Sequence, residues 1–356
     1  MHYMVSDGDT LWLIAQRFRS DAEALARANS IHEPYNVYPG QILHIPRRHR
    51  LLGYVAPHAA AAGVADALSS PEPFDEIIYT SVTVAPDGSA SAGPVDSAVQ
   101  MVRARRTRVL ASVTNLWQGA YSTQAADAAL LDADTRSQLA SVACDCAASN
   151  GLDGVHLEFG AITTEHFTAI SELACEIREK LSRLNPWYTL SISAPSFWAD
   201  EPFDLVSATK CANTVIIEGF QRGSRGPAGP PTSMEWLRRQ AARAVERIDR
   251  SRLCIALGVY GLDWDESDES AFLSLEAAYE TALETGARVD RDSTHGGPGF
   301  SYTDSTGRSH QVWYEDAASI LMKIALLEAM GIQKIALWRL GVIPYDVLSV
   351  ASQAVV

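Results

Sequence analysis

The stretch GLDGVHLEFG, residues 151–160, decides how the rest of the chain is interpreted. A turn of small residues precedes an apolar run that carries Asp153 and Glu158. A short apolar run of this kind is typical of a buried parallel strand. Side chains alternate along a strand, so if Glu158 points inward then His156 and Gly160 do too, with Gly160 outermost. The stretch therefore predicts a functional strand whose outermost inward position has no side chain.

Seven further stretches of similar character follow residue 50: LLGYVAP, EIIYTSVTV, TRVLASVTN, TLSISAP, TVIIEGF, RLCIALGVYG and KIALWRLG. Amphipathic segments with helical periodicity, such as TRSQLASVACDCAASN, separate them. Eight strands alternating with helices predict an α/β fold, a (β/α)8 TIM barrel. The longest gap, about 265–312, lies between the seventh and eighth strands, where we expect an insertion.

The first 46 residues predict a separate small domain. HYMVSDGDTLWLIAQRF indicates a strand followed by a helix, SDAEALARAN a second helix, and YPGQILHIP a turn and a closing strand. This order predicts a βααβ domain over 1–46. A linker over 47–52, containing the basic run RRHR, is then expected to lead into the barrel over 53–356.

Composition limits the classes of partner. The formal net charge of −14 excludes nucleic acid, because neutralising phosphates needs a basic surface. No apolar run approaches the roughly 20 residues of a transmembrane helix, and the N-terminus lacks the features of a secretion signal. Five scattered cysteines, an odd number, predict reduced thiols. We expect cytoplasmic synthesis, with a spore or the cell wall as a further destination.

GDTLWLIAQRF, an asparagine before an aliphatic residue, and VYPGQILHIP together resemble a LysM module nearly end to end. The resemblance implies binding of glycans that carry N-acetylglucosamine, such as peptidoglycan or chitin, in a shallow groove between two loops. The groove residues that it implies lie in the first strand–helix loop and the second helix–strand loop: Gly8, Asp9, Thr10, Asn29, Ser30 and Ile31.

The strands over 51–356 resemble glycoside hydrolase family 18, within it the spore-cortex-lytic, YaaH-type branch that carries LysM modules and degrades peptidoglycan. The matching motifs are LGYVAP, LDGVHLEF, ISAPS, LGVYGLDW, FSYTDSTGRSHQVWYED and IALWRLG. The resemblance implies substrate-assisted hydrolysis, an exception to the two-carboxylate scheme. In it a strand-four glutamic acid protonates the glycosidic oxygen, an aspartate two residues earlier orients the substrate acetamide, and a strand-six Tyr-Asp pair assists.

This sequence departs from the family pattern at those positions. Asp153 keeps the first acid, His156 replaces the second, Glu158 stands where the orienting aspartate belongs, and Gly160 stands where the general acid belongs. On strand six, IIEGFQ supplies Glu218, Phe220 and Gln221. Glycine has no proton to donate, and general acid catalysis contributes about 10²–10⁴-fold. We therefore predict that the ordinary family mechanism does not operate.

Three hypotheses follow. The chain is a non-cleaving glycan-binding or spore- and wall-associated pseudoenzyme, an enzyme with a relocated acid, or a barrel used for another small glycoside or metabolite. The second makes Glu218 the general acid, Glu158 the base or charge stabiliser, and His156 a tuning or relay group, with Asp153 as a further catalytic candidate. This second hypothesis is favoured because buried carboxylates cost free energy. Random substitution in an unused site would therefore more readily leave apolar residues there. Against it, His156 pairing with Glu158 or Glu218 would make a merely structural cluster.

Substrate contacts are expected from aromatic rings and from residues that follow strands. Tyr260 and Trp338 would form a sugar-stacking floor, while Asn115, His58 and Gln221 would line the cleft. His295 and His310 look isolated in the insertion, so no metal site and no cofactor is expected. The expected partner is an N-acetylated glycan of the peptidoglycan or chitin type.

Overall fold

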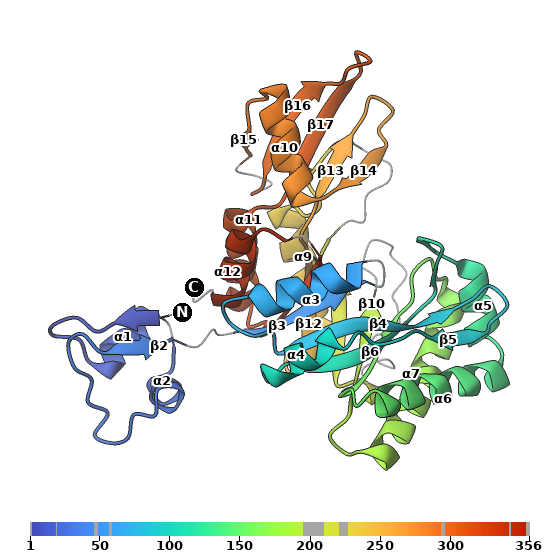
Figure 1. The fold of residues 1–356 in the computed structure, drawn as a ribbon, viewed down its shortest axis with the longest axis horizontal. Coiled ribbons are helices and arrows are strands. Elements are labelled where there is room, and N and C mark those ends of the chain that lie inside the picture. The colour runs from blue at the N-terminus through green and yellow to red at the C-terminus, as the bar shows by residue number, and fades with distance from the viewer. Residues whose placement is uncertain are drawn as a thin grey trace.

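The computed structural model describes residues 2–18, 20–45, 49–56, 59–194, 210–220, 227–292, 296–341 and 343–353. Its N-terminal unit contains β1 (His2–Met4), α1 (Leu11–Arg17), α2 (Ala22–Ala28) and β2 (Ile42–His44), with β1 antiparallel to β2. This confirms the βααβ order. A small core of buried aliphatic side chains holds it together, including Leu11, Ile14, Leu25, Leu43 and Ile45. In Figure 1 the unit projects from one side of the barrel domain, and His44 Nδ1 of β2 lies 3.5 Å from Glu72 Oε1 of that domain.

Eight parallel strands form a closed barrel, which confirms the predicted fold class. They are β3 (Arg50–Val55), β4 (Glu76–Val84), β6 (Arg108–Thr114), β9 (Gly154–Glu158), β10 (Thr189–Ala194), β11 (Thr214–Glu218), β12 (Leu253–Gly258) and β18 (Lys334–Leu340). Closure follows because β3 pairs with both β18 and β4. The barrel begins at Arg50, inside the linker that we expected over 47–52, because Arg50 already pairs in register with Lys334.

Helices surround the strands (Figure 1): α3 (Ala60–Ser69), α4 (Ala98–Ala104), α5 (Thr123–Leu130), α6 (Ala133–Ser149), α7 (Thr164–Leu184), α9 (Met234–Arg247), α11 (Ala317–Ala329) and α12 (Tyr345–Gln353). Aliphatic residues on the outward faces of the strands form the larger core, between sheet and helices. A second core fills the barrel itself and is richer in aromatic and small residues. None of the described helices is both long and apolar enough to cross a lipid bilayer.

The expected insertion is a five-stranded antiparallel sheet with one helix. It contains β13 (Gly261–Trp264), β14 (Ser270–Leu273), α10 (Leu275–Thr285), β15 (Asp290–Arg291), β16 (Pro298–Thr303) and β17 (Ser309–Tyr314), and its strand order is β14-β13-β17-β16-β15. It starts at Gly261 rather than near residue 265, since β13 pairs along its length with β17.

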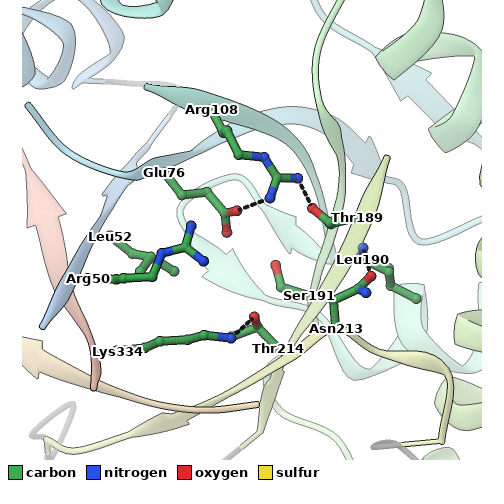
Figure 2. A pocket seen from close by; sticks show the side chains of 10 residues that line it. All are labelled: Arg50, Leu52, Glu76, Arg108, Thr189, Leu190, Ser191, Asn213, Thr214 and Lys334. Atoms are coloured by element: carbon green, nitrogen blue, oxygen red, sulfur yellow. Dashed lines mark hydrogen bonds and ion pairs between the residues drawn. The ribbon is translucent and has the colours of Figure 1, made fainter. Parts of the chain in front are cut away.

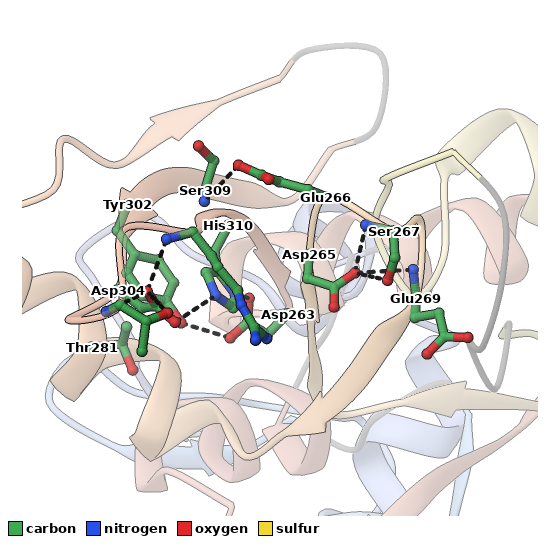
Figure 3. A network of polar contacts seen from close by, with 12 residues as sticks. Asp263, Asp265, Glu266, Ser267, Glu269, Thr281, Tyr302, Asp304, Ser309 and His310 are labelled. Carbon is green, nitrogen blue, oxygen red and sulfur yellow. Dashed lines mark hydrogen bonds and ion pairs between the residues drawn. The ribbon is translucent and has the colours of Figure 1, made fainter.

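A polar network ties this insertion together (Figure 3). The Tyr302 hydroxyl donates to Asp263 Oδ2 at 2.8 Å, and His310 Nδ1 lies 2.9 Å from Asp263 Oδ1. His310 Nε2 lies 3.6 Å from Asp304 Oδ2. The expectation that His310 is isolated is therefore wrong, because strand pairing brings distant residues around it.

The cysteines also differ from expectation. Cys175 on α7 and Cys211, just before β11, form a disulfide with a Cα–Cα distance of 5.0 Å. The prediction of five reduced thiols is wrong for this pair, because α7 packs beside the segment entering β11 and brings the two side chains together. Cys144, Cys146 and Cys254 remain free and buried.

Candidate functional site

The side-chain alternation predicted along β9 is confirmed. Leu157 and Phe159 belong to the core between the strands and the helices. His156 contacts serine hydroxyls of β10 inside the barrel, and Glu158 lines a hollow there together with Tyr54 of β3. Gly160, two residues further on, therefore lies at the barrel mouth with no side chain.

Tyr121 fills the space beside Gly160. It ends a short hairpin formed by β7 (Leu116–Trp117) and β8 (Ala120–Tyr121). A Cβ atom built on Gly160 would lie 2.5–2.7 Å from three carbons of the Tyr121 ring. Distances below 3.0 Å are not found for real Cβ atoms, so a side chain at position 160 and the present Tyr121 ring exclude each other.

The same tyrosine binds the remaining acid of the strand. Tyr121 Oη donates to Glu158 Oε1 at 2.6 Å, and Glu158 is 8% exposed. Tyr121 was not among the residues predicted from the sequence, although a signal was available. Gln118 and Gly119 both adopt positive φ in the tight turn of the hairpin, and glycine as the second central residue is typical of such a turn. Nothing in that local pattern indicates that the ring reaches Gly160.

Asn115 holds the hairpin against the end of β9. Its side chain is fully buried, and its Nδ2 donates to the carbonyl oxygens of Ser122 (2.9 Å) and Gly160 (2.8 Å). Its Oδ1 accepts the Gly160 N–H at 2.9 Å. The prediction that Asn115 lines the cleft is wrong, because its amide is committed to backbone groups. Asn115 instead positions Tyr121.

Glu218, at the end of β11, faces the hollow beside Gly160. This cavity of about 200 Å³ is lined by residues from the ends of β9, β10 and β11 and from the hairpin, namely Tyr121, Phe159, Gly160, Ala161, Ile162, Ser193, Ala194 and Glu218. A smaller hollow of about 30 Å³ is lined by Glu158, Tyr54, Trp338 and Arg339 among others. Tyr121 borders both, so its ring separates the surroundings of the two glutamates.

His156 lies inside the barrel and forms hydrogen bonds with neighbouring hydroxyl groups. It is fully buried, with Nδ1 2.7 Å from Ser191 Oγ, and Nε2 3.1 Å from Ser193 Oγ and 3.4 Å from the Tyr54 hydroxyl. Burial lowers the pKa of His156 to about 3, so its imidazole is neutral at neutral pH. The pairing with Glu158 or Glu218, considered as the structural alternative, is not formed, since hydroxyl groups satisfy both ring nitrogens.

Asp153 lies at the opposite end of the barrel from the mouth. Its Oδ1 is 3.2 Å from Arg103 Nη2, and its Oδ2 accepts the Val109 N–H at 2.9 Å. Catalytic groups of TIM barrels lie at the C-terminal ends of the strands. The prediction of a catalytic role for Asp153 is wrong, because it precedes the first residue of β9 and ties β9 to its neighbours.

Tyr260 and Trp338, the two rings predicted to stack on sugar at the mouth, lie in different surroundings. Tyr260 is 1% exposed and stacks on Phe272 at 5.0 Å, so the prediction that it stacks on sugar is wrong. Trp338 is half-buried and lines the smaller hollow. It stacks on Phe220 at 5.0 Å, and the Arg339 guanidinium lies 5.6 Å from its ring centre.

The N-terminal unit holds its six predicted residues in two loops. Gly8, with φ +86°, Thr10 and Ser30 are exposed, and Ile31 packs against the small core. Asp9 accepts hydrogen bonds from the Tyr3 hydroxyl (2.6 Å) and the Ser6 N–H (2.7 Å), which lower the pKa of Asp9.

Asn29 uses its side-chain amide within the fold. Its Nδ2 donates to the carbonyl oxygens of Leu25 and His44, at 2.8 and 2.7 Å, and its Oδ1 accepts the His44 N–H at 2.6 Å. It therefore joins α2 to β2 and shapes the second loop. Trp12 and Tyr38, which were not among the predicted residues, are 56% and 65% exposed on this unit.

Two predicted cleft residues, His58 and Gln221, lie outside the described residues, as does His295. Within the described ranges, no group of three or more histidine, cysteine, aspartate or glutamate side chains is arranged to hold a metal ion. The charged and phenolic side chains that line the two hollows at the described part of the mouth are Glu158, Glu218, Arg339, Tyr54 and Tyr121.

Comparisons with known proteins match two families along the chain. The family model described as LysM domain matches residues 3–46, and the one described as Glycosyl hydrolases family 18 matches residues 50–342. The Bacillus subtilis protein YdhD, whose name refers to a sporulation-specific glycosylase, is 23% identical over 400 residues that cover 95% of this chain and 94% of that protein. The cortical fragment-lytic enzyme of Bacillus subtilis is 24% identical over 72% of this chain and 62% of its own length.

Solved structures share the architecture. The spore cortex-lytic enzyme SleL of Bacillus cereus superposes with a TM-score of 0.75 at 21% identity, covering 99% of this chain and 86% of that one. SleL of Bacillus megaterium QM B1551 gives a TM-score of 0.73 at 22% identity, covering 98% and 84%. At these identities the likeness establishes a common fold.

Proposed function

The chain belongs to glycosyl hydrolase family 18, and we propose that it binds N-acetylated glycan of the peptidoglycan type without cleaving it by the family's substrate-assisted route. The cleft at the barrel mouth would hold the sugar, and the LysM domain would hold the polymer. Relatives named for spore cortex-lytic and cortical fragment-lytic activity support the glycan class.

The observation that carries this proposal is the position of the Tyr121 ring. It fills the place that a general acid at position 160 would need, and its hydroxyl hydrogen-bonds Glu158. A glycoside leaving group needs a proton in the transition state, and position 160 offers none. The sequence alone favoured retained chemistry; the filled space beside Gly160 shifts our preference to binding.

Glu158 suits the binding role. A carboxylate accepts hydrogen bonds through two oxygens and several lone pairs, so it can receive both the Tyr121 hydroxyl and the N–H of a substrate acetamide. In the family pattern the same strand position orients that acetamide. We therefore assign Glu158 to acetamide recognition, with Trp338 beside it in the smaller hollow.

Binding and turnover, measured together, test the proposal. Calorimetric titration of the full chain with N-acetylglucosamine oligomers should give saturable binding, and Glu158→Gln should weaken the component that depends on the barrel. Reducing-end release from the same oligomers and from cortex peptidoglycan should stay at background. Clear turnover by the unmodified protein would contradict the proposal. If Glu158→Gln leaves binding unchanged, the barrel does not take part in glycan binding. The hypothesis that the barrel is used for another small glycoside or metabolite would then be favoured.

One observation favours a second candidate, a hydrolase with a relocated acid. Glu218 lines the same cavity as Gly160 and is half-buried, so its carboxyl group faces the space next to the missing acid. If Glu218 donates the proton, Glu218→Gln abolishes turnover while leaving binding nearly unchanged. The outcome separates the two candidates, because a binding protein has no turnover to lose.

A further inference from the structure

A second cavity lies at the opposite, N-terminal end of the barrel, which we call the barrel floor (Figure 2). It has a volume of about 100 Å³. The residues lining it include the first residue of six barrel strands, Arg50, Glu76, Arg108, Thr189, Thr214 and Lys334, together with Leu52, Leu190, Ser191 and Asn213. Closure of the barrel therefore gathers side chains that are far apart in the sequence.

The charges on the barrel floor are unbalanced. Three cations, Arg50, Arg108 and Lys334, line the cavity with one carboxylate, Glu76, in a chain of net charge −14. Asp75, next to the cavity, pairs with Arg50, so the local excess is one positive charge. Figure 2 shows these side chains pointing toward one another from different strands. Like charges so close to one another are unfavourable unless an anion or a carboxylate compensates for them.

In the described part of the chain, carboxylates lie within ion-pair distance of the two arginines but not of the lysine. Arg108 Nη1 is 3.7 Å from Glu76 Oε2, and Arg50 Nε is 3.8 Å from Asp75 Oδ1 on the outside. Among the described residues, the Lys334 ammonium donates to Thr214 Oγ1 at 2.9 Å and forms no ion pair. An ammonium group has three donors, so two of those of Lys334 are available.

The electrostatics agree with this geometry. The pKa of Lys334 is lowered, first by burial, with Arg50 and Arg108 adding to the effect. The pKa of Glu76 is raised by burial, against the opposing effect of the three cations. Both shifts mean that the floor disfavours its present charges, and a bound anion would relieve the repulsion among the cations.

We propose that the barrel floor binds a tetrahedral oxyanion, inorganic phosphate, between Arg50, Arg108 and Lys334. The cavity volume of about 100 Å³ is of the size that a small inorganic anion needs. Donors approach from several strands, which suits oxygens pointing in several directions better than the two coplanar oxygens of a carboxylate. Arg50 is exposed, so the anion reaches the cavity from solvent.

Calorimetric titration of the full chain with inorganic phosphate, at constant ionic strength in chloride, tests the site. We expect saturable binding at one site, competition by sulfate, and much weaker competition by acetate. Lys334→Met and Arg50→Met should each weaken phosphate binding at least about tenfold, the loss of one charged hydrogen bond. Arg238→Met, at an exposed position of α9, is the matched control and should leave binding unchanged.

Thermal unfolding separates a binding role from a structural one. Lys334→Met should unfold in chloride at the same temperature as the unmodified chain or higher, because repulsion is removed, and it should lose the stabilisation by phosphate. A non-saturating phosphate response, equal competition by acetate, or unchanged binding in both floor variants would overturn the proposal. So would destabilisation of Lys334→Met in chloride combined with an unchanged response to phosphate.

Discussion

The two ends of the barrel differ in what their side chains can do. The mouth presents two glutamates, Glu158 and Glu218, with Tyr121 between their hollows and Trp338 at the side. The floor presents three cations around one carboxylate. Family resemblance concerns the mouth, where this chain lacks the expected acid. At the mouth the Tyr121 ring occupies the place of the missing side chain, whereas at the floor the Lys334 ammonium keeps donors available for a ligand.

The largest expected effect comes from rebuilding the acid at the mouth. The double variant Tyr121→Ala/Gly160→Glu removes the obstructing ring and restores the carboxyl group beside Glu158. We expect reducing-end release from N-acetylglucosamine oligomers to rise by about 10²-fold over the unmodified chain, the low end of general-acid effects, because Phe220 replaces the assisting tyrosine.

The single variants are the controls for this experiment. Gly160→Glu alone should stay at background, because its Cβ would lie within 2.5–2.7 Å of Tyr121 ring carbons, and Tyr121→Ala alone has no acid at position 160. Circular dichroism spectra of all three variants should be recorded to establish that each variant folds. Full activity of Gly160→Glu by itself would show that Tyr121 does not block the position.

A smaller effect is expected from the residue that positions the ring. Asn115→Ala removes three buried hydrogen bonds to backbone groups of Ser122 and Gly160. We expect the free energy of unfolding to fall by about 2 kcal/mol in urea titrations, since buried backbone groups lose their partners. Asn150→Ala, which loses one hydrogen bond to the Cys146 carbonyl oxygen and one long contact to the Cys146 sulfur at the end of α6, should cost about 0.5–1 kcal/mol. Equal losses would argue against a special role for Asn115.

Acid should weaken the fold through His156. The pKa of His156 in the folded chain is about 3, below the ordinary 6.5, so this group's contribution to stability is fully present above pH 6.5 and is lost as pH falls toward 3. We expect a loss of about 1.4 kcal/mol per pH unit below 6.5 from this residue. His156→Asn should show a correspondingly flatter profile between pH 6.5 and 5 in urea titrations. Parallel profiles would show that His156 does not titrate on unfolding.

The smallest effect is expected at the floor. Glu76→Gln removes the carboxylate that opposes an anion, and unit charges about 5 Å apart interact by about 0.8 kcal/mol even in a water-like dielectric, so phosphate affinity should rise at least roughly fourfold. Since the pKa of Glu76 is raised, the stability of the unmodified chain should also decrease as pH rises through 4.5 toward that higher value. This decrease should vanish in Glu76→Gln. Weaker phosphate binding would mean that Glu76 supports the site.

The barrel is predicted well from the sequence because each strand is marked by a pattern within a few consecutive residues. Apolar runs mark the eight strands, and alternation along β9 places His156 and Glu158 inside. Tyr121 lies 39 positions before Gly160, and only the closed barrel and the Asn115 contacts bring the two together. The burial of Tyr260 depends in the same way on Phe272 from the insertion.

The floor could not be predicted at all from spacing. Its cations come from positions 50, 108 and 334, which neither form a motif nor share a periodicity. They meet because each lies at the start of a barrel strand, and strand starts converge only after closure. For Asp153 the motif was misleading. Its position in the motif suggested a catalytic role, but it precedes β9 and therefore lies at the N-terminal end of the barrel, away from the mouth.

A crystal structure of the unmodified chain with a bound N-acetylglucosamine tetramer tests the central claim most directly. We predict an intact oligomer at the mouth, its acetamide N–H on Glu158, the Tyr121 ring still against Gly160, and no carboxyl group within hydrogen-bond distance of the bridging oxygen. A cleaved oligomer, or the Glu218 carboxyl group placed about 3 Å from that oxygen with Tyr121 moved aside, would contradict it.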